Sequence, residues 1–315
     1  MSPRRRVVKR VFKTFLPILI IVVVAVGGIM IWIVRGITRP PRAPYLITPQ
    51  SGLAIGPILK AKDVSWSNHD GTKARGWIIS GAEGAPAVVL LHRYGADRSW
   101  LLNLAVKLNE TTNFTVLWPD MRGHGENPPV NWTLFGTIEG DDATAAIDYL
   151  RTLKTPAGKQ QVGFIGIYGS ELGAYSGLDA AKRYPEIRAM ALDSVPAAPD
   201  DLVRAATNAR MSFNNVVLQA LGRLGMRFYT FGKFQNTPSC ELARSLRNER
   251  VLLLAGEVND PWRASTLDLE PCFAGGSVEV KKDLSLTGAN LAAATGEQEE
   301  AYDRPVIDFF DKALR

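Results

Sequence analysis

The stretch QVGFIGIYGSELGAYSGLDA, residues 161–180, decides the fold of this 315-residue chain. Its first part, from Val162 to Tyr168, is rich in β-branched and aromatic residues, which predicts a buried parallel strand. Good helix formers with apolar spacing begin at Leu172, so only three residues remain to turn the chain. The stretch therefore predicts a sharp strand–turn–helix.

Two glycines, Gly169 and Gly173, bracket Glu171 at the tip of this turn. This is the G-x-nucleophile-x-G spacing of a nucleophile elbow, in which the glycines let the backbone bend and the central side chain is held out. An esterase has serine at the centre, and a histidine removes its proton. The nearest hydroxyl, Ser170, lies one residue early and cannot take the central place while both glycines keep theirs.

Three further motifs each follow a strand-like run. They are His92-Arg93-Tyr94-Gly95 after residues 87–91, Asp120-Met121-Arg122-Gly123-His124-Gly125 after residues 114–118, and Gly256-Glu257-Val258-Asn259-Asp260-Pro261 after residues 251–255. Together with the elbow, they resemble the motifs of the α/β-hydrolase superfamily, in its esterase, lipase and serine-peptidase branch. The resemblance covers roughly residues 62–315, about one ordinary domain.

The resemblance implies an α/β fold with a mostly parallel eight-stranded sheet flanked by helices. We expect this domain over residues 60–315, with an opening hairpin at 64–80 and a helical cap inserted at about 196–249. Apolar residues in the insertion recur at roughly helical spacing. They are Phe213, Val217, Leu221, Leu224 and Phe228. This stripe indicates either an amphipathic cap over the elbow or simple core packing.

The resemblance also implies roles for single residues. The backbone N–H groups of Arg93 and Leu172 would form the oxyanion hole, and Asp260 would be the triad acid, with Asn259 as its rival. The loop that contains His124 would be architectural, so we do not expect this histidine to act as a general base.

Two of the three triad positions depart from the family. No histidine follows His124, and after the last strand-like run Asn290 cannot shuttle protons because an amide does not titrate. Glu171 would lie at the first turn of a helix, so we expect exposed N–H groups to lower its carboxyl pKa. His92, more simply a structural residue, is the alternative partner for an active Glu171.

These departures favour a catalytically impaired or non-catalytic protein that binds a small or lipid-like ligand, or a protein partner, under its cap. The alternative is an active hydrolase of carboxylic esters or related bonds that uses Glu171 in place of the serine. The sequence contains no phosphate loop or metal-ligand cluster, so we expect neither cofactor nor metal.

Residues 15–34 carry no charge, and twenty helical residues rise about 30 Å, the thickness of a bilayer's hydrocarbon core. The run continues directly into Arg35 without a cleavage site, which favours a retained spanning helix over a signal peptide. Six basic residues in the tail 1–14 against three soon after the helix place the N-terminus in the cytoplasm and the domain outside. The proline-rich residues 35–59 would form a semi-rigid linker.

The net charge of +6 comes from the N-terminus, because residues 1–42 hold nine of the 37 basic residues and no acidic one. Beyond them the chain has 28 basic and 31 acidic residues, a mildly acidic balance that argues against nucleic-acid binding. The two cysteines, Cys240 and Cys272, either pair or stay free, and the sequence does not decide between these states.

Overall fold

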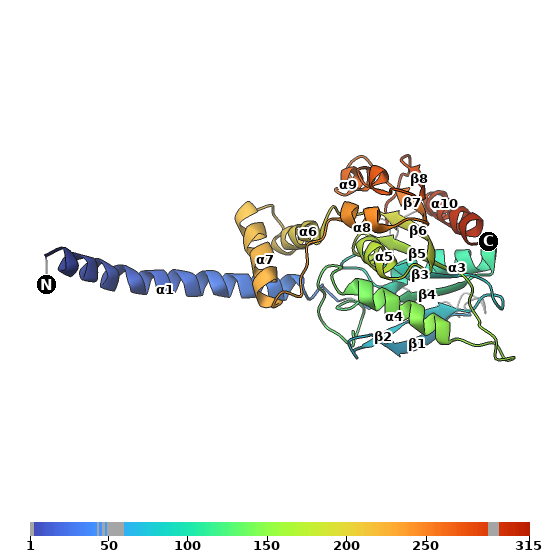
Figure 1. Ribbon diagram of the computed structural model, residues 1–315, viewed down its shortest axis with the longest axis horizontal. Coiled ribbons are helices and arrows are strands. Elements are labelled where there is room, and N and C mark those ends of the chain that lie inside the picture. Colours follow the sequence, from blue (N-terminus) through green and yellow to red (C-terminus); the bar gives the residue numbers. More distant parts are fainter. Residues whose placement is uncertain (1–2, 43, 46–47, 49–59, 289–295) are drawn as a thin grey trace. The chain divides into compact units, whose positions relative to one another are not determined.

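The computed structural model describes residues 3–42, 44–45, 48, 60–288 and 296–315, and they form two compact units (Figure 1). The first unit combines the residues up to Ile37 with Val203–Phe234. The second combines Thr38–Leu202 with Gln235–Arg315. The predicted hydrolase domain corresponds to the second unit, without the middle of its cap insertion.

The second unit is built on an eight-stranded sheet in the order β1-β2-β4-β3-β5-β6-β7-β8. The strands are β1 (Lys62–Ser67), β2 (Lys73–Ile79), β3 (Ala87–Leu91), β4 (Thr115–Pro119), β5 (Ile165–Ser170), β6 (Ile187–Asp193), β7 (Arg250–Leu254) and β8 (Ser277–Lys281). β2 is antiparallel to both β1 and β4, and the other neighbours are parallel. The predicted hairpin and mostly parallel sheet are confirmed.

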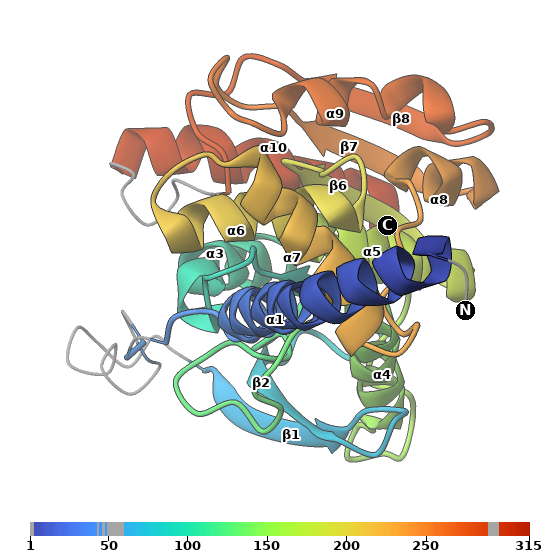
Figure 2. The same cartoon turned by 90° about the vertical axis from the view of Figure 1, so that its left-hand side faces the viewer.

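Helices cover both faces of the sheet, as Figure 2 shows. The longer ones are α3 (Leu102–Thr112), α4 (Glu139–Thr152), α5 (Leu172–Arg183) and α10 (Gly296–Leu314), and the shorter ones are η1 (Arg98–Leu101), α8 (Ser239–Ser245), α9 (Arg263–Leu267) and η2 (Glu270–Cys272). α3 packs with α10, and α4 packs with α5. Because both faces are covered, β3 and β5 are buried along their whole length.

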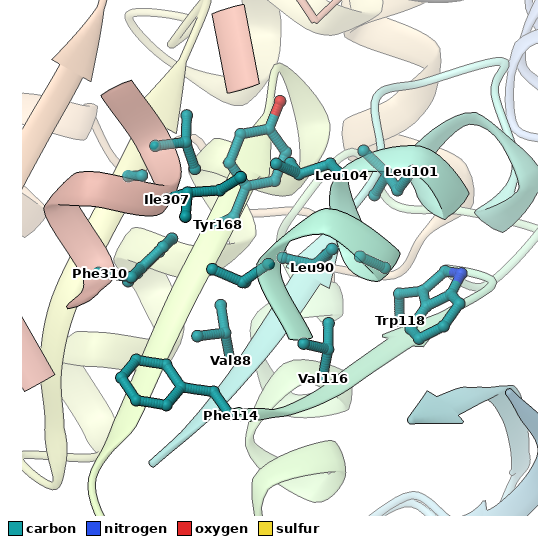
Figure 3. Close-up of a cluster of buried hydrophobic side chains, with 14 of the residues drawn as sticks. Val88, Leu90, Leu101, Leu104, Phe114, Val116, Trp118, Tyr168, Ile307 and Phe310 are labelled. Carbon is teal, nitrogen blue, oxygen red and sulfur yellow. The ribbon is translucent and has the colours of Figure 1, made fainter. Parts of the chain in front are cut away.

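The core between the sheet and the α3–α10 pair is shown in Figure 3. Val88 and Leu90 of β3 and Tyr168 of β5 pack against Leu104 of α3 and Phe310 of α10. These side chains are almost fully excluded from solvent. The core fixes β5, and with it the turn that follows this strand.

The first unit contains α1 (Pro3–Ile37) and α7 (Val216–Tyr229), together with most of α6 (Pro199–Met211). α1 continues three residues past the predicted end at Val34. The apolar stripe of the cap insertion lies at Phe213 and along α7. Its members Phe213, Val217, Leu224 and Phe228 are exposed to solvent. The core-packing interpretation of these residues is therefore wrong.

A disulfide joins Cys240 of α8 to Cys272 of η2. The two cysteines are therefore paired, which the sequence alone did not decide. It closes a loop across 32 positions of sequence, which contains β7 and the turn that carries Asp260.

Candidate functional site

Glu171 lies at the turn between β5 and α5, with φ 54° and ψ −106°. A Cβ atom on Gly169 would overlap the backbone of Gly173, and a Cβ on Gly173 would overlap the carbonyl of Leu91. Both positions therefore require glycine. A side chain at positive φ costs about 1–3 kcal/mol and persists only where the surroundings hold it. The structure thus has the strained strand–turn–helix that the sequence predicts.

The Glu171 carboxyl lacks the expected helix contacts. Its backbone N–H donates to the carbonyl of Asp193 at 2.9 Å, but within the described residues no hydrogen bond reaches the carboxyl. Burial raises the pKa of Glu171 to about 7, against the Arg93 guanidinium and with help from the charges of Asp260 and Asp193. The prediction of a lowered pKa is wrong, because burial outweighs the attraction of Arg93 and no helix N–H of the described residues reaches the carboxyl.

Asp260 is linked to a second acid through a hydroxyl. Ser194 Oγ lies 3.0 Å from Asp260 Oδ2 and 2.9 Å from Asp193 Oδ1. The single hydrogen of the Ser194 hydroxyl is therefore shared between the two acids, which accept it from either side. Burial raises the pKa of Asp193 to about 7, although the hydrogen bonds that it accepts from Tyr302, Gly288 and Ser194 favour its ionised form.

Asp193 also ties the turn after β6 to the loop after β8, where the family's histidine is expected. Its Oδ2 accepts a hydrogen bond from Tyr302 Oη at 2.6 Å and another from the N–H of Gly288. Tyr302 Oη in turn lies 2.6 Å from Tyr168 Oη. Asn290, which is expected in this loop, lies outside the described residues.

The two buried histidines have structural partners. His92 Nε2 accepts from the N–H of Met121 at 3.0 Å, so Nδ1 carries the proton that it donates to the carbonyl of Arg93 at 2.8 Å. Burial lowers the pKa of His92 to about 4 and that of His124 to about 3. His92 is therefore neutral, and its two ring nitrogens bond to backbone rather than to Glu171.

Comparison with known proteins gives structural matches alone. No family model matches the chain, and no curated protein matches it. The Pyrococcus furiosus esterase Pf2001 is 18% identical, with 88% of this chain and 98% of that chain covered and a TM-score of 0.66. The α/β hydrolase GrgF from Penicillium sp. sh18 is 17% identical, with 81% and 99% covered and a TM-score of 0.56.

The chain has the α/β-hydrolase fold. A third match, the acylaminoacyl peptidase of Pyrococcus horikoshii, is 14% identical with a TM-score of 0.57. It covers 81% of this chain but 41% of the peptidase, so the likeness concerns part of that longer protein. The fold agrees with the resemblance that the elbow and the three loop motifs indicated.

Within the α/β-hydrolase fold, the two residues predicted for the oxyanion hole occupy different surroundings. Leu172 is the first residue of α5, so its N–H has no acceptor inside the helix. Arg93 follows β3, and its guanidinium lies 4.6 Å from the ring centre of Trp100 and donates to the carbonyl of Tyr94 at 3.1 Å. The oxyanion roles of Arg93 and Leu172 stay predictions.

The loop after β4 is architectural, as its sequence indicates. Asp120 accepts hydrogen bonds from Tyr45 Oη at 2.6 Å and from the backbone N–H of Arg98 at 3.2 Å. Arg122 donates twice to Asp142, at 2.5 Å for each bond, which is the bidentate geometry of a strong pair. A cavity of about 20 Å³ beside this loop has room for about one water, so it is no substrate pocket.

Sequence reasoning missed Asp193 and Ser194. Asp193 is the last residue of β6, which lies next to β5, and parallel strands end at the same edge of a sheet. An acid at the end of the strand after the elbow was therefore a usable signal. Among the described residues, no group of three or more His, Cys, Asp or Glu side chains is arranged to hold a metal ion.

Proposed function

We propose that this protein is a membrane-anchored α/β-hydrolase-fold protein that binds a ligand or partner at its elbow and does not catalyse acyl transfer. The chemistry of the elbow carries this proposal. Acyl transfer needs a nucleophile at the tip and a base that removes its proton. Glu171 stands at the tip, while the ring nitrogens of His92 are bonded to backbone.

The Glu171 carboxyl is suited to binding. With a pKa raised to about 7 by burial, it is protonated in part of the molecules near neutral pH. The protonated form donates a hydrogen bond, and the ionised form accepts hydrogen bonds and attracts a cation. We infer that the ligand is a small or lipid-like molecule with a polar group that pairs with this carboxyl.

The membrane anchor is α1. Residues Phe12–Ile37 form a 26-residue helical span with a mean hydropathy of 2.9, and most of its large apolar side chains are exposed. A signal sequence would also be apolar and N-terminal, but it would be removed. α1 instead packs against α7 of its own unit, which supports a retained helix. The excess of basic residues before α1 favours a cytoplasmic N-terminus and an extracytoplasmic domain.

One observation favours a second function, hydrolysis with Glu171 as a general acid or base. A group with a pKa near the working pH is the most effective proton carrier, and the Glu171 pKa of about 7 meets this condition. A water molecule would then be the nucleophile in place of serine. Asp260, linked through Ser194 to Asp193, would then be the acid nearest in role to the triad acid of the family.

Ester hydrolysis separates the two functions. Turnover of p-nitrophenyl acetate, butyrate and octanoate is measured for the full-length wild type, for Glu171→Gln and for Glu110→Gln, a matched change at an exposed glutamate of α3. We expect all three proteins to stay at the background rate. Turnover that is present in wild type and Glu110→Gln but lost in Glu171→Gln would overturn the non-catalytic proposal and support the second function.

A gain-of-function variant tests the elbow itself. We expect the double change Glu171→Ser and Asn290→His to hydrolyse the acetate ester, while Glu171→Ser alone stays at background because no imidazole takes the serine proton. Equal activity in both variants would show that another group acts as the base.

A further inference from the structure

α7 crosses α1 at a steep angle, near the part of α1 that leads out of the apolar span, and both helices lie in the first unit (Figure 1). A Cβ atom on Gly222 would lie 3.4 Å from Ile33 Cγ2, and one on Gly225 would lie 2.7 Å from Val34 Cγ2. Small residues at such positions let two helices approach closely, as they do in membranes. The contact is therefore close, and at Gly225 it leaves no room for a Cβ atom against Val34.

The last residue of α7, Tyr229, contacts the apolar span of α1. Tyr229 Oη donates a hydrogen bond to the carbonyl of Gly27 at 3.1 Å. Gly27 precedes Val34, the end of the uncharged stretch, by seven residues, which is about 10 Å along a helix. If the uncharged stretch of α1 spans the hydrocarbon core, Gly27 lies about 10 Å inside that core, so the Tyr229 side chain reaches the acyl chains.

The tip after α7 displays apolar side chains that the described chain leaves uncovered. Phe228 is 64% exposed and Phe231 is 92% exposed. Phe231 has φ 51°, a strained conformation for a bulky residue, and it is followed by Gly232 with φ 78°. Val216 and Val217, at the start of α7, are exposed as well. A large exposed apolar patch of this kind marks an interaction site.

The charges around this surface have one sign. Residues 203–234 contain five basic residues and no acidic one. They are Arg204, Arg210, Arg223, Arg227 and Lys233. Arg210 lies 5.9 Å from the ring centre of Trp32, near the exit of the span. Basic residues beside exposed aromatic ones are the pattern of a helix that lies in a membrane surface.

We propose that α7 and its tip form a second membrane contact, in which Phe228 and Phe231 enter the leaflet that α1 leaves. The basic side chains of Arg210, Arg223 and Lys233 then pair with anionic lipid headgroups. This inference rests on the proposed membrane anchor, because the depth of the tip is set by its contacts with α1. Its occupant is the lipid bilayer, and a second copy of the chain is the competing occupant that the test distinguishes.

Lipid quenching of a fluorescent label tests the proposal. Because both native cysteines are joined in the disulfide, an added cysteine is the single free thiol of the chain. Full-length Phe231→Cys and Phe228→Cys are labelled with the environment-sensitive dye NBD and reconstituted in vesicles of phosphatidylcholine and phosphatidylglycerol. Nitroxide-labelled lipid is then added as the quencher. Phe164→Cys, at an exposed phenylalanine of the second unit, is the matched control, and Val24→Cys marks the span.

We expect quenching at positions 228 and 231 of about half or more of that at Val24, and little at Phe164, since an interfacial helix buries its apolar face about 5–10 Å deep. Quenching at Val24 without quenching at 228 and 231 would overturn this inference and leave the anchor intact. No quenching at Val24 would overturn the anchor as well. Blue-shifted, unquenched labels that transfer energy between copies would assign the surface to a second chain.

Discussion

Replacing Glu171 by glutamine tests the electrostatics of the elbow directly. The carboxyl has an ordinary pKa of 4.5, and burial raises it to about 7 in the folded protein. Between these two pH values the folded state keeps a proton that the unfolded state has released, so stability falls as the pH rises. At 1.36 kcal/mol for each pH unit, the full cost above pH 7 is about 3 kcal/mol. Because Glu171 keeps some contact with solvent, about 3 kcal/mol is an upper limit for this cost.

Glutamine has nearly the same shape and does not titrate, so Glu171→Gln removes this cost. We expect the variant to be more stable than wild type by less than about 1 kcal/mol at pH 5 and by up to about 3 kcal/mol at pH 8. Urea unfolding of the full-length protein in detergent, followed by tryptophan fluorescence between pH 5 and 8, measures the difference. Glu110→Gln, at an exposed site, should leave the pH dependence unchanged. Parallel wild-type and Glu171→Gln curves, or a loss of stability in Glu171→Gln at pH 8, would refute the reasoning.

Three further changes have expected outcomes in the same urea assay. Arg122→Ala leaves the buried Asp142 carboxylate unpaired and should cost about 3–5 kcal/mol, with a smaller loss for Arg122→Lys. Cys240→Ser with Cys272→Ser should lose about 3–4 kcal/mol, and a reducing agent should reproduce this loss in wild type. Gly173→Ala should destabilise, although the same change in an open helix stabilises by about 1 kcal/mol, so a rise in stability would contradict the elbow geometry.

The local part of the candidate site could be predicted from the sequence. The elbow is a contiguous stretch, and the spacing of Gly169 and Gly173 around Glu171 is enough to fix the bend. The Asp120 loop was likewise predicted as architectural, because its arginine, acid and glycines stand next to one another in the chain. Short-range geometry and periodic burial are encoded within a few residues, so they can be read without the fold.

The electrostatics of Glu171 could not be predicted in this way. The sequence placed the carboxyl at a helix start and favoured a lowered pKa, whereas burial and two acids from β6 and the turn after β7 raise it. Asp193 and Asp260 are separated from Glu171 by 22 and 89 positions and approach it because parallel strands end at one edge of the sheet. A pKa depends on all charges and on the exclusion of water around a group, and these are properties of the packed structure.

By itself the sequence determined the α/β-hydrolase sheet, the apolar span and the replacement of serine by Glu171, because each is written in neighbouring residues. Tertiary structure alone decided the pairing of the two cysteines, the bonding of His92 to backbone and the packing of α7 against α1. These features join residues far apart in the chain. Their free energies arise from contacts and burial that exist only once the strands and helices have packed.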